Sequence, residues 1–211
     1  MAYKACIFDL DGTLADTLRS IAGFGNDTLN AFGLPAIPVE EYKQLVGNGA
    51  DVLMDRMLGA VGAQLPPEER KRFRQEYDRR YEAQPMRFVV PSPGRPELLG
   101  ELKSRGLKLG VLSNKPDNMT RYIAGELYGA VLDGVHGQRA GVPKKPDPTA
   151  LLALARELGV EPGEAAWTWT PGATRAWTPA GCCGASGAGR SCWPTGPAIW
   201  PPTPPGCGPL C

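Results

Sequence analysis

The sequence ACIFDLDGTL, residues 5–14 of this 211-residue chain, decides its fold. The apolar run from Ala5 to Phe8 is typical of a buried strand, and it ends on two carboxylates, Asp9 and Asp11, with Gly12 closing the turn. Both acids therefore lie at the carboxyl end of the predicted strand. In an open α/β sheet, ligands bind in the crevice outside this end of the strands. A strand that simply ends in a polar Asp-Gly turn is the alternative interpretation.

Strands and helices alternate in the second half of the chain, up to about residue 166. A second apolar strand is expected at residues 107–112, followed by Ser113-Asn114-Lys115-Pro116, and a third at residues 130–132. The helices expected here are residues 95–105, 118–126 and 149–158. This alternation predicts an α/β fold, namely a Rossmann-like, doubly wound parallel sheet with right-handed crossovers.

The pattern of residues 16–90 predicts a helical insertion with no strand of its own. Helical spacing of apolar residues occurs at residues 16–32 and 38–46, each followed by Gly, and helices are also expected at residues 50–58 and 67–81. The predicted domain organisation is therefore a core made of residues 1–15 and 91–166, an inserted helical domain of residues 16–90, and a tail of residues 167–211.

Composition excludes several classes of function. The formal net charge is +1 and no basic run stands out, which argues against a nucleic-acid-binding protein. No apolar segment approaches the roughly 18 residues that a membrane span needs. The chain leads directly into a strand without a visible secretory signal, so we expect a soluble cytoplasmic protein. The single histidine, His136, lies in a glycine-rich stretch that predicts a surface loop.

Three segments resemble, in order, the signatures of the haloacid dehalogenase-like hydrolases. Asp9-Leu10-Asp11-Gly12-Thr13-Leu14 is similar, position for position, to the first signature. Ser113 after a strand resembles the second, and Lys145-Pro146-Asp147-Pro148 resembles the third. Taken alone, Ser113 is an ordinary turn residue and Lys145 a solvent-exposed lysine. Their order after the first segment favours the family, and the resemblance covers about residues 3–166.

The resemblance implies a magnesium-dependent phosphatase that passes through an aspartyl phosphate. A carboxylate that attacks a phosphate dianion is repelled unless cations intervene, which explains why acids and a lysine occur together. The implied catalytic residues are the nucleophile Asp9 and the general acid and base Asp11. The implied phosphate-binding residues are Ser113, Asn114 and Lys145, and Gly12 and Thr13 support the loop. Mg²⁺ would bind the Asp9 carboxylate, the backbone carbonyl of Asp11 and an acid of a fourth motif.

The fourth motif, a further strand that ends in an acidic cluster, is not found. Its place is taken by Trp167-Thr168-Trp169-Thr170, and no Asp or Glu occurs after Glu164. Residues 167–211 are rich in Trp, Pro, Gly and Cys and predict an irregular tail. Each Trp-Thr pair, read one base earlier, becomes an apolar residue followed by Asp, so we interpret this tail as a frameshift product. The missing acid predicts impaired catalysis.

The insertion resembles the helical cap of this family and points to its phosphoglycolate phosphatase branch. The residues that carry this similarity are Leu45-Val46-Gly47-Asn48-Gly49-Ala50 and Pro93-Gly94. It implies that the substrate is a small phosphorylated metabolite such as 2-phosphoglycolate, with neither nucleic acid nor membrane as a partner. Other capped enzymes of the family remain alternatives: a pyrophosphatase, a sugar-phosphate or nucleotide phosphatase, or a phosphomutase. A non-catalytic binding protein is a further alternative.

Overall fold

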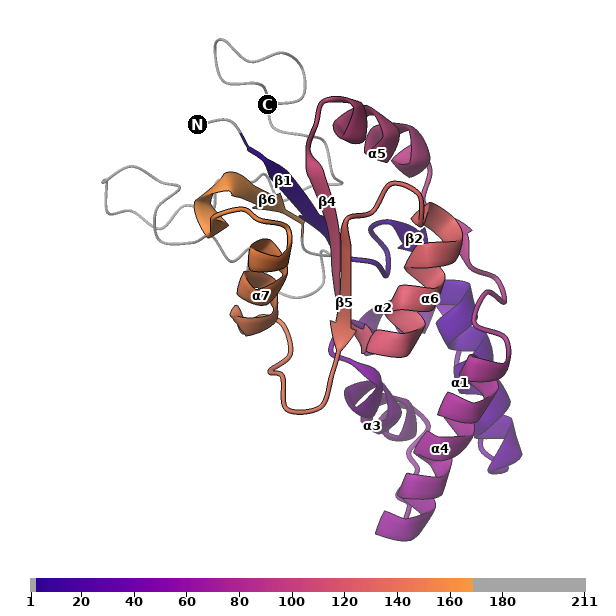
Figure 1. Ribbon diagram of the computed structural model, residues 1–211. Coiled ribbons are helices and arrows are strands. Elements are labelled where there is room, and N and C mark those ends of the chain that lie inside the picture. Colours follow the sequence, from indigo (N-terminus) through magenta and orange to yellow (C-terminus); the bar gives the residue numbers. More distant parts are fainter. Residues whose placement is uncertain (1–2, 169–211) are drawn as a thin grey trace, which may run out of the picture.

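A parallel four-stranded sheet forms the centre of the molecule (Figure 1). The computed structural model describes residues 3–168. The strand order is β5-β4-β1-β6, and every neighbouring pair is parallel. In the central register Ile7 lies opposite Gly110 on one side and Trp167 on the other. The strands are β1 (Ala5–Phe8), β4 (Lys108–Pro116), β5 (Gly134–Gln138) and β6 (Ala165–Trp167).

Helices cover both faces of this sheet, which confirms the predicted Rossmann-like α/β fold (Figure 1). Side chains alternate along β1, so Cys6 and Phe8 pack with one layer of helices while Ala5 and Ile7 pack with the other. The first layer is α5 (Arg95–Ser104) and α6 (Asp117–Tyr128), and the second is α7 (Thr149–Glu157). Burial of these apolar faces is the main stabilising term, at about 25 cal/mol per Å² removed from water.

The insertion forms a helical layer beyond the carboxyl ends of the strands (Figure 1). It has an apolar cluster of its own, in which Phe24 stacks on Tyr81 at 4.7 Å and Phe32 meets Phe73 edge-on at 5.1 Å between ring centroids. Its helices are α1 (Leu18–Ala31), a 3₁₀ turn (Val39–Glu41), α2 (Tyr42–Leu45), α3 (Ala50–Ala60) and α4 (Pro67–Ala83). None of the helices among residues 3–168 is both long and apolar enough to cross a bilayer.

Two short strands join the insertion to the core, so the expectation that residues 16–90 contain no strand residues was wrong. Strand β2 (Ala15–Asp16) pairs antiparallel with β3 (Val90–Pro91), and Ser92 N–H also donates to the carbonyl of Leu14 at 2.8 Å. The two connections pair because they leave and re-enter the core side by side. A pairing this short has no periodicity that a sequence could reveal.

The third strand lies at β5 and not at residues 130–132 as expected. Residues 129–131 complete the end of α6, where Val131 N–H donates to the Tyr128 carbonyl at 2.9 Å. Asp133 then fixes the start of β5, since its carboxylate accepts a hydrogen bond from Leu109 N–H at 2.9 Å. His136 was likewise expected on the surface, but it is buried in β5, with Nε2 2.6 Å from Glu157 Oε2.

The glycines of β5 make this strand resemble a loop in the sequence. They are needed because neighbouring helices pack too closely against β5 for side chains at these positions. A Cβ on Gly137 would lie 2.5 Å from Asp117 Cα. We expect Gly137→Ala to destabilise the protein by about 2 kcal/mol or more. Gly125→Ala is the control and should be neutral or slightly stabilising. This glycine lies in a helix, and a Cβ added to it would have no neighbour within 4 Å outside its own helix. Urea unfolding of both variants checks this, and equal midpoints would contradict the close packing.

The fourth strand is present in part, although the sequence had indicated its loss. Residues Ala165–Trp167 form β6 and pair with β1. Apart from Trp167 and Thr168, the predicted irregular tail lies outside the described residues, and the frameshift interpretation stays a prediction.

Candidate active site

The turn after β1 holds Asp9 at the carboxyl end of the sheet. Leu10 N–H donates to Asp9 Oδ1 at 2.8 Å, and the Leu10 carbonyl accepts from the amides of Leu14 and Ala15, each at 3.0 Å. Gly12 has a φ of +73°, a conformation that glycine adopts without strain. The tight turn therefore keeps both acids of the first signature on one side of the loop. Thr13 contributes its carbonyl, which accepts from Arg95 Nε at 3.1 Å.

The structure brings Lys145 to Asp9, although 136 positions separate them in the sequence. Lys145 Nζ lies 2.9 Å from Asp9 Oδ1, and only 8% and 13% of the two side chains are exposed. The same ammonium donates to the Leu112 carbonyl at 2.8 Å. A nearly buried ion pair of this geometry fixes a cation beside the carboxylate that is expected to attack phosphorus.

Asn114 holds Lys145 in place. Its Oδ1 accepts from Lys145 N–H at 2.8 Å, while Nδ2 donates to the carbonyls of Lys145 and Gly47, each at 3.2 Å. An amide has two N–H donors, and both are used here. Asn114 therefore links the core to the insertion, and its contact with a phosphate stays a prediction.

Ser113 lies inside β4 and not after its end, because that strand continues to Pro116. Its side chain is 4% exposed, and its Oγ accepts from Lys115 N–H at 3.2 Å. A hydroxyl that accepts one bond still has its own O–H to donate. Ser113 lines the same cavity as Asp9, so its hydroxyl can serve an anion bound there.

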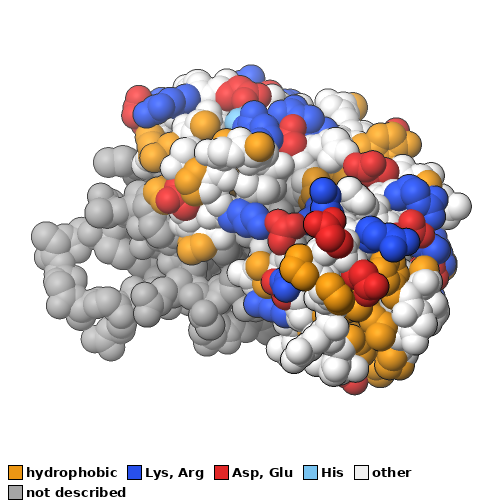
Figure 2. All heavy atoms as spheres, turned by 90° about the horizontal axis from the view of Figure 1, so that it is seen from below, with side chains coloured by type: hydrophobic (Ala, Val, Ile, Leu, Met, Phe, Trp, Pro, Cys, Tyr) orange, Lys and Arg blue, Asp and Glu red, His pale blue; other side chains and the backbone are white. Residues whose placement is uncertain are grey.

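A cavity of about 640 Å³ separates the core from the insertion. Figure 2 shows the face beyond the carboxyl ends of the strands, where Lys and Arg are interspersed with Asp and Glu. Mixed charge of this kind does not form the basic surface that nucleic acid requires. The core lines the cavity with Asp9, Asp11, Ser113, Asn114, Lys115 and Met119, and the insertion with Arg19, Leu53, Arg74, Tyr77 and Tyr81 among others.

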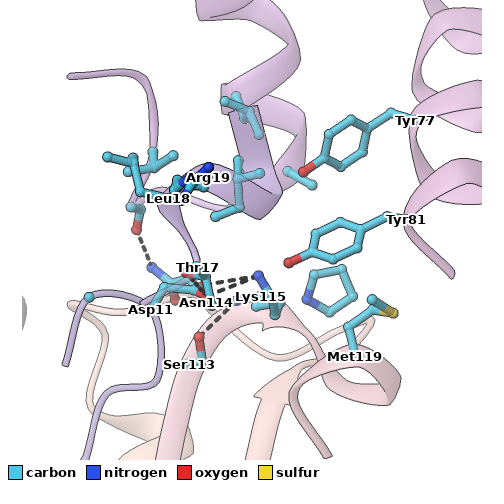
Figure 3. A pocket seen from close by; sticks show the side chains of 18 of the residues that line it. Asp11, Thr17, Leu18, Arg19, Tyr77, Tyr81, Ser113, Asn114, Lys115 and Met119 are labelled. Carbon is cyan, nitrogen blue, oxygen red and sulfur yellow. Dashed lines mark hydrogen bonds and ion pairs between the residues drawn. The ribbon is translucent and has the colours of Figure 1, made fainter. Parts of the chain in front are cut away.

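Asp11 faces a lysine whose role the sequence left open. Lys115 Nζ lies 3.0 and 3.1 Å from the two carboxylate oxygens of Asp11, and the Thr17 hydroxyl donates to Oδ1 at 2.7 Å (Figure 3). Burial disfavours the charged form of Lys115, but Asp11 and Tyr81 outweigh it and raise the pKa of this lysine above its usual value. Lys115 is therefore a buried cation and not a solvent-exposed one. Thr17 had no recognisable signal in the sequence.

This geometry agrees with a family match that covers most of the chain. The model of the haloacid dehalogenase-like hydrolases matches residues 3–167. The chain belongs to this family. Its matched part includes both acids of the first signature and the lysine of the third.

Relatives within the haloacid dehalogenase-like family are phosphatases, which places the chain among the phosphoric monoester hydrolases. A phosphoglycolate phosphatase from Rhodospirillum rubrum is 35% identical, over 77% of this chain and 69% of its own length. An N-acetylmuramic acid 6-phosphate phosphatase from Pseudomonas aeruginosa is 33% identical, over 77% and 71%. The chain thus spans about two thirds of the length of these curated relatives.

A solved structure shows the same likeness in three dimensions. The crystal structure described as a predicted phosphoglycolate phosphatase from Haemophilus somnus superposes with a TM-score of 0.73 at 27% identity. The superposition covers 78% of this chain and 76% of the other. The shared fold therefore extends over nearly all of the described residues.

Haloacid dehalogenase-like phosphatases generally use a divalent metal ion, and the donors here fit one only in part. The Asp9 carboxylate and the Asp11 carbonyl are hard oxygen donors. At the end of β6, where the family places a further acid, stands Thr168, whose Oγ1 accepts from Asp9 N–H at 3.3 Å. Within residues 3–168 no cluster of three or more His, Cys, Asp or Glu residues could hold a metal. A bound ion would depend on phosphate and water for its other ligands.

Proposed function

We propose that the chain hydrolyses a small phosphomonoester such as 2-phosphoglycolate through an aspartyl phosphate on Asp9. The observation that supports this most strongly is the Lys145 ammonium, which lies 2.9 Å from the Asp9 carboxylate beside a cavity large enough for a small metabolite. The phosphoglycolate phosphatases among its relatives suggest the substrate. We further propose that residues 16–90 act as a cap over the site and that the enzyme works in the cytoplasm.

In the first half-reaction Asp9 attacks the phosphorus atom. The bond between phosphorus and the ester oxygen breaks as the bond from Asp9 forms, and Asp11 gives its proton to the departing oxygen. In the second half, Asp11 takes a proton from water whose oxygen attacks the same phosphorus. Inorganic phosphate leaves and the Asp9 carboxylate is restored.

Lys145 and Ser113 bind the phosphoryl group in this mechanism. Lys145 offsets the charge of both Asp9 and the incoming phosphate, and Ser113 donates its hydroxyl hydrogen to a phosphate oxygen. The amide of Leu10 already donates to Asp9 Oδ1, so it orients the nucleophile. The amide of Asp11 is the other donor that we assign to this loop.

Mg²⁺ is the ion that we propose for the site, held by the Asp9 carboxylate and the Asp11 carbonyl. When bound, it would supply positive charge that offsets the repulsion between Asp9 and the phosphate dianion. Because Thr168 supplies no charge, we propose that the ion is held weakly and that hydrolysis by this chain is impaired.

Replacing Thr168 by aspartate is expected to tighten Mg²⁺ binding by about 10-fold, because it adds a carboxylate next to the amide of Asp9. Calorimetric titration with Mg²⁺ measures this without relying on turnover. Thr168→Asn is the matched control, since it has the same shape and no charge. Equal affinities of the two variants would show that this position lies outside the coordination sphere.

Phosphate release from a panel of esters tests the proposed function. With Mg²⁺ present, we expect slow hydrolysis of p-nitrophenyl phosphate and faster hydrolysis of 2-phosphoglycolate. The Pseudomonas aeruginosa relative makes a sugar phosphate the second candidate, so glucose 6-phosphate belongs in the panel. Preference for the sugar phosphate would replace 2-phosphoglycolate as the proposed substrate and leave the proposed mechanism unchanged. No release from any ester, even after Thr168→Asp, would favour a non-catalytic binding protein.

A further inference from the structure

Lys115 connects the core to the insertion through two different contacts. On the core side its ammonium contacts both oxygens of Asp11, at 3.0 and 3.1 Å. On the other side it lies 4.9 Å from the centroid of the Tyr81 ring, which belongs to α4. Only 5% of the lysine side chain is exposed. A cation this buried needs a partner at every stage of a reaction, because leaving it uncompensated is strongly unfavourable.

The hydroxyl of Tyr81 is a second unusual group at the same place. Tyr81 is 5% exposed, and its Oη is buried without a hydrogen bond of normal geometry among residues 3–168, although Lys115 and Ser20 lie close enough to influence it. Figure 3 shows Tyr77 and Tyr81 directing their hydroxyls from α4 into the cavity, with Tyr81 turned toward Lys115. A buried hydroxyl without a well-formed hydrogen bond is costly, so this O–H is available to an acceptor in the cavity.

As a general acid Asp11 carries a proton and is neutral, so it no longer compensates the charge of Lys115. Both oxygens of Asp11 contact the ammonium, and Oδ1 also accepts from Thr17. The oxygen that carries the proton for the ester oxygen is no longer a charged acceptor for Lys115. An N–H of Lys115 then lacks its acceptor, next to a tyrosine hydroxyl that already lacks one. Two donors and a positive charge converge on one point of the cavity.

From this convergence we propose that Lys115 and Tyr81 bind a carboxylate of the leaving group, which replaces part of the contact between Lys115 and Asp11. The inference rests on the proposed function and identifies the carboxylate as the part of the substrate that these two residues recognise. A carboxylate suits it because its two oxygens can accept from both donors at once, with charge assistance from the lysine. A neutral alcohol leaves the freed N–H unsatisfied.

The reach of the site favours an acid in which carboxylate and ester are close together. One hydrogen bond joins Lys115 to Asp11 and a second joins Asp11 to the ester oxygen, so the ammonium lies about 6 Å from that oxygen when both bonds share one carboxylate oxygen and at most about 8 Å when they do not. A carboxylate one carbon from the ester-bearing carbon or directly attached to it falls inside this range. The site therefore fits a phosphorylated 2-hydroxy acid better than an ester whose acid group is remote.

Paired ligands on the full-length Asp9→Asn variant test the subsite without turnover. The ligands are 2-phosphoglycolate and ethyl phosphate, which differ in the carboxylate, and calorimetry with Mg²⁺ present gives both dissociation constants. We expect at least about 10-fold tighter binding of 2-phosphoglycolate. Adding Tyr81→Phe should reduce that preference several-fold, and adding Lys115→Met should remove it. Tyr42→Phe is the control, since its hydroxyl contacts Asn26 at 3.0 Å, outside the cavity.

The outcomes distinguish failure of the carboxylate subsite from failure of the proposed phosphatase function. Equal affinities for the two ligands, or a preference that survives Tyr81→Phe unchanged, would overturn the carboxylate subsite and leave the phosphatase proposal standing. Failure of both ligands to bind would overturn the proposed function and the subsite with it. If Lys115→Met does not fold, Tyr81→Phe alone still decides, because the phenylalanine preserves the stacking on Phe24 at 4.7 Å.

Discussion

Asp9→Asn is expected to lower hydrolysis of phosphomonoesters by at least about 1,000-fold while the fold stays intact. An amide cannot form the covalent bond to phosphorus, whereas its oxygen can still accept from Leu10 N–H and Lys145, which lie 2.8 and 2.9 Å from Asp9 Oδ1. Steady-state phosphate release with Mg²⁺ measures the loss, and thermal unfolding reports the fold.

Asp16→Asn is the matched control for this variant. Asp16 is an exposed carboxylate that lines the same cavity. Removing its charge should leave the rate within about two-fold, because a solvent-exposed charge contributes little to the local potential. If Asp9→Asn kept a tenth or more of the activity, Asp9 would not be the nucleophile.

Lys145→Met is expected to lower kcat/KM by about 100-fold or more and also to destabilise the protein by about 3 kcal/mol. The ammonium is the cation closest to the nucleophile in the ion pairs of the described residues, and its loss leaves a nearly buried carboxylate without that partner. Both effects have one cause, so they should appear together in kinetics and in urea unfolding.

Lys144→Met provides the comparison for that change. Lys144 is the preceding residue, and its ammonium pairs at 3.5 Å with Asp51, which is 72% exposed. An exposed pair of this kind is worth about 1 kcal/mol at most. A small effect at position 144 and a large one at position 145 would assign the loss to the contact with Asp9. Equal effects would attribute the loss to the overall charge of the loop.

The part of the site that the sequence predicts best is the part whose geometry is local. Asp9, Asp11 and Gly12 follow a buried strand within a few positions, and the turn between them is set by its own backbone hydrogen bonds. The convergence of Lys145 on Asp9 was expected from the resemblance of residues 145–148 to the third signature of the family. The expectation for the two acids depended on strand direction, and the expectation for Lys145 depended on the resemblance; neither required the details of side-chain packing.

What the sequence could not predict depends on contacts between distant elements. β5 resembles a loop in the sequence because Gly134 and Gly137 leave space for packed neighbours. A Cβ placed on Gly134 would lie 2.8 Å from the Leu154 side chain, and one placed on Gly137 would meet backbone atoms. Lys115 and a solvent-exposed lysine look the same in a sequence. Only the positions of Asp11 and of Tyr81 on α4 make it a buried cation. Asn114 was expected at the phosphate from the family resemblance, and nothing local reveals that its amide also binds Lys145 and Gly47.

The central claim, that Asp9 becomes phosphorylated, is tested most directly by trapping the intermediate. The enzyme is mixed with 2-phosphoglycolate and Mg²⁺, quenched in acid and treated with borohydride, which reduces an acyl phosphate of aspartate to homoserine. Mass spectrometry of the peptide that contains residues 5–14 then identifies the modified position. Homoserine at position 9, and none in Asp9→Asn, is the predicted result. Turnover that continues with position 9 unmodified, or a label on another residue, would contradict it.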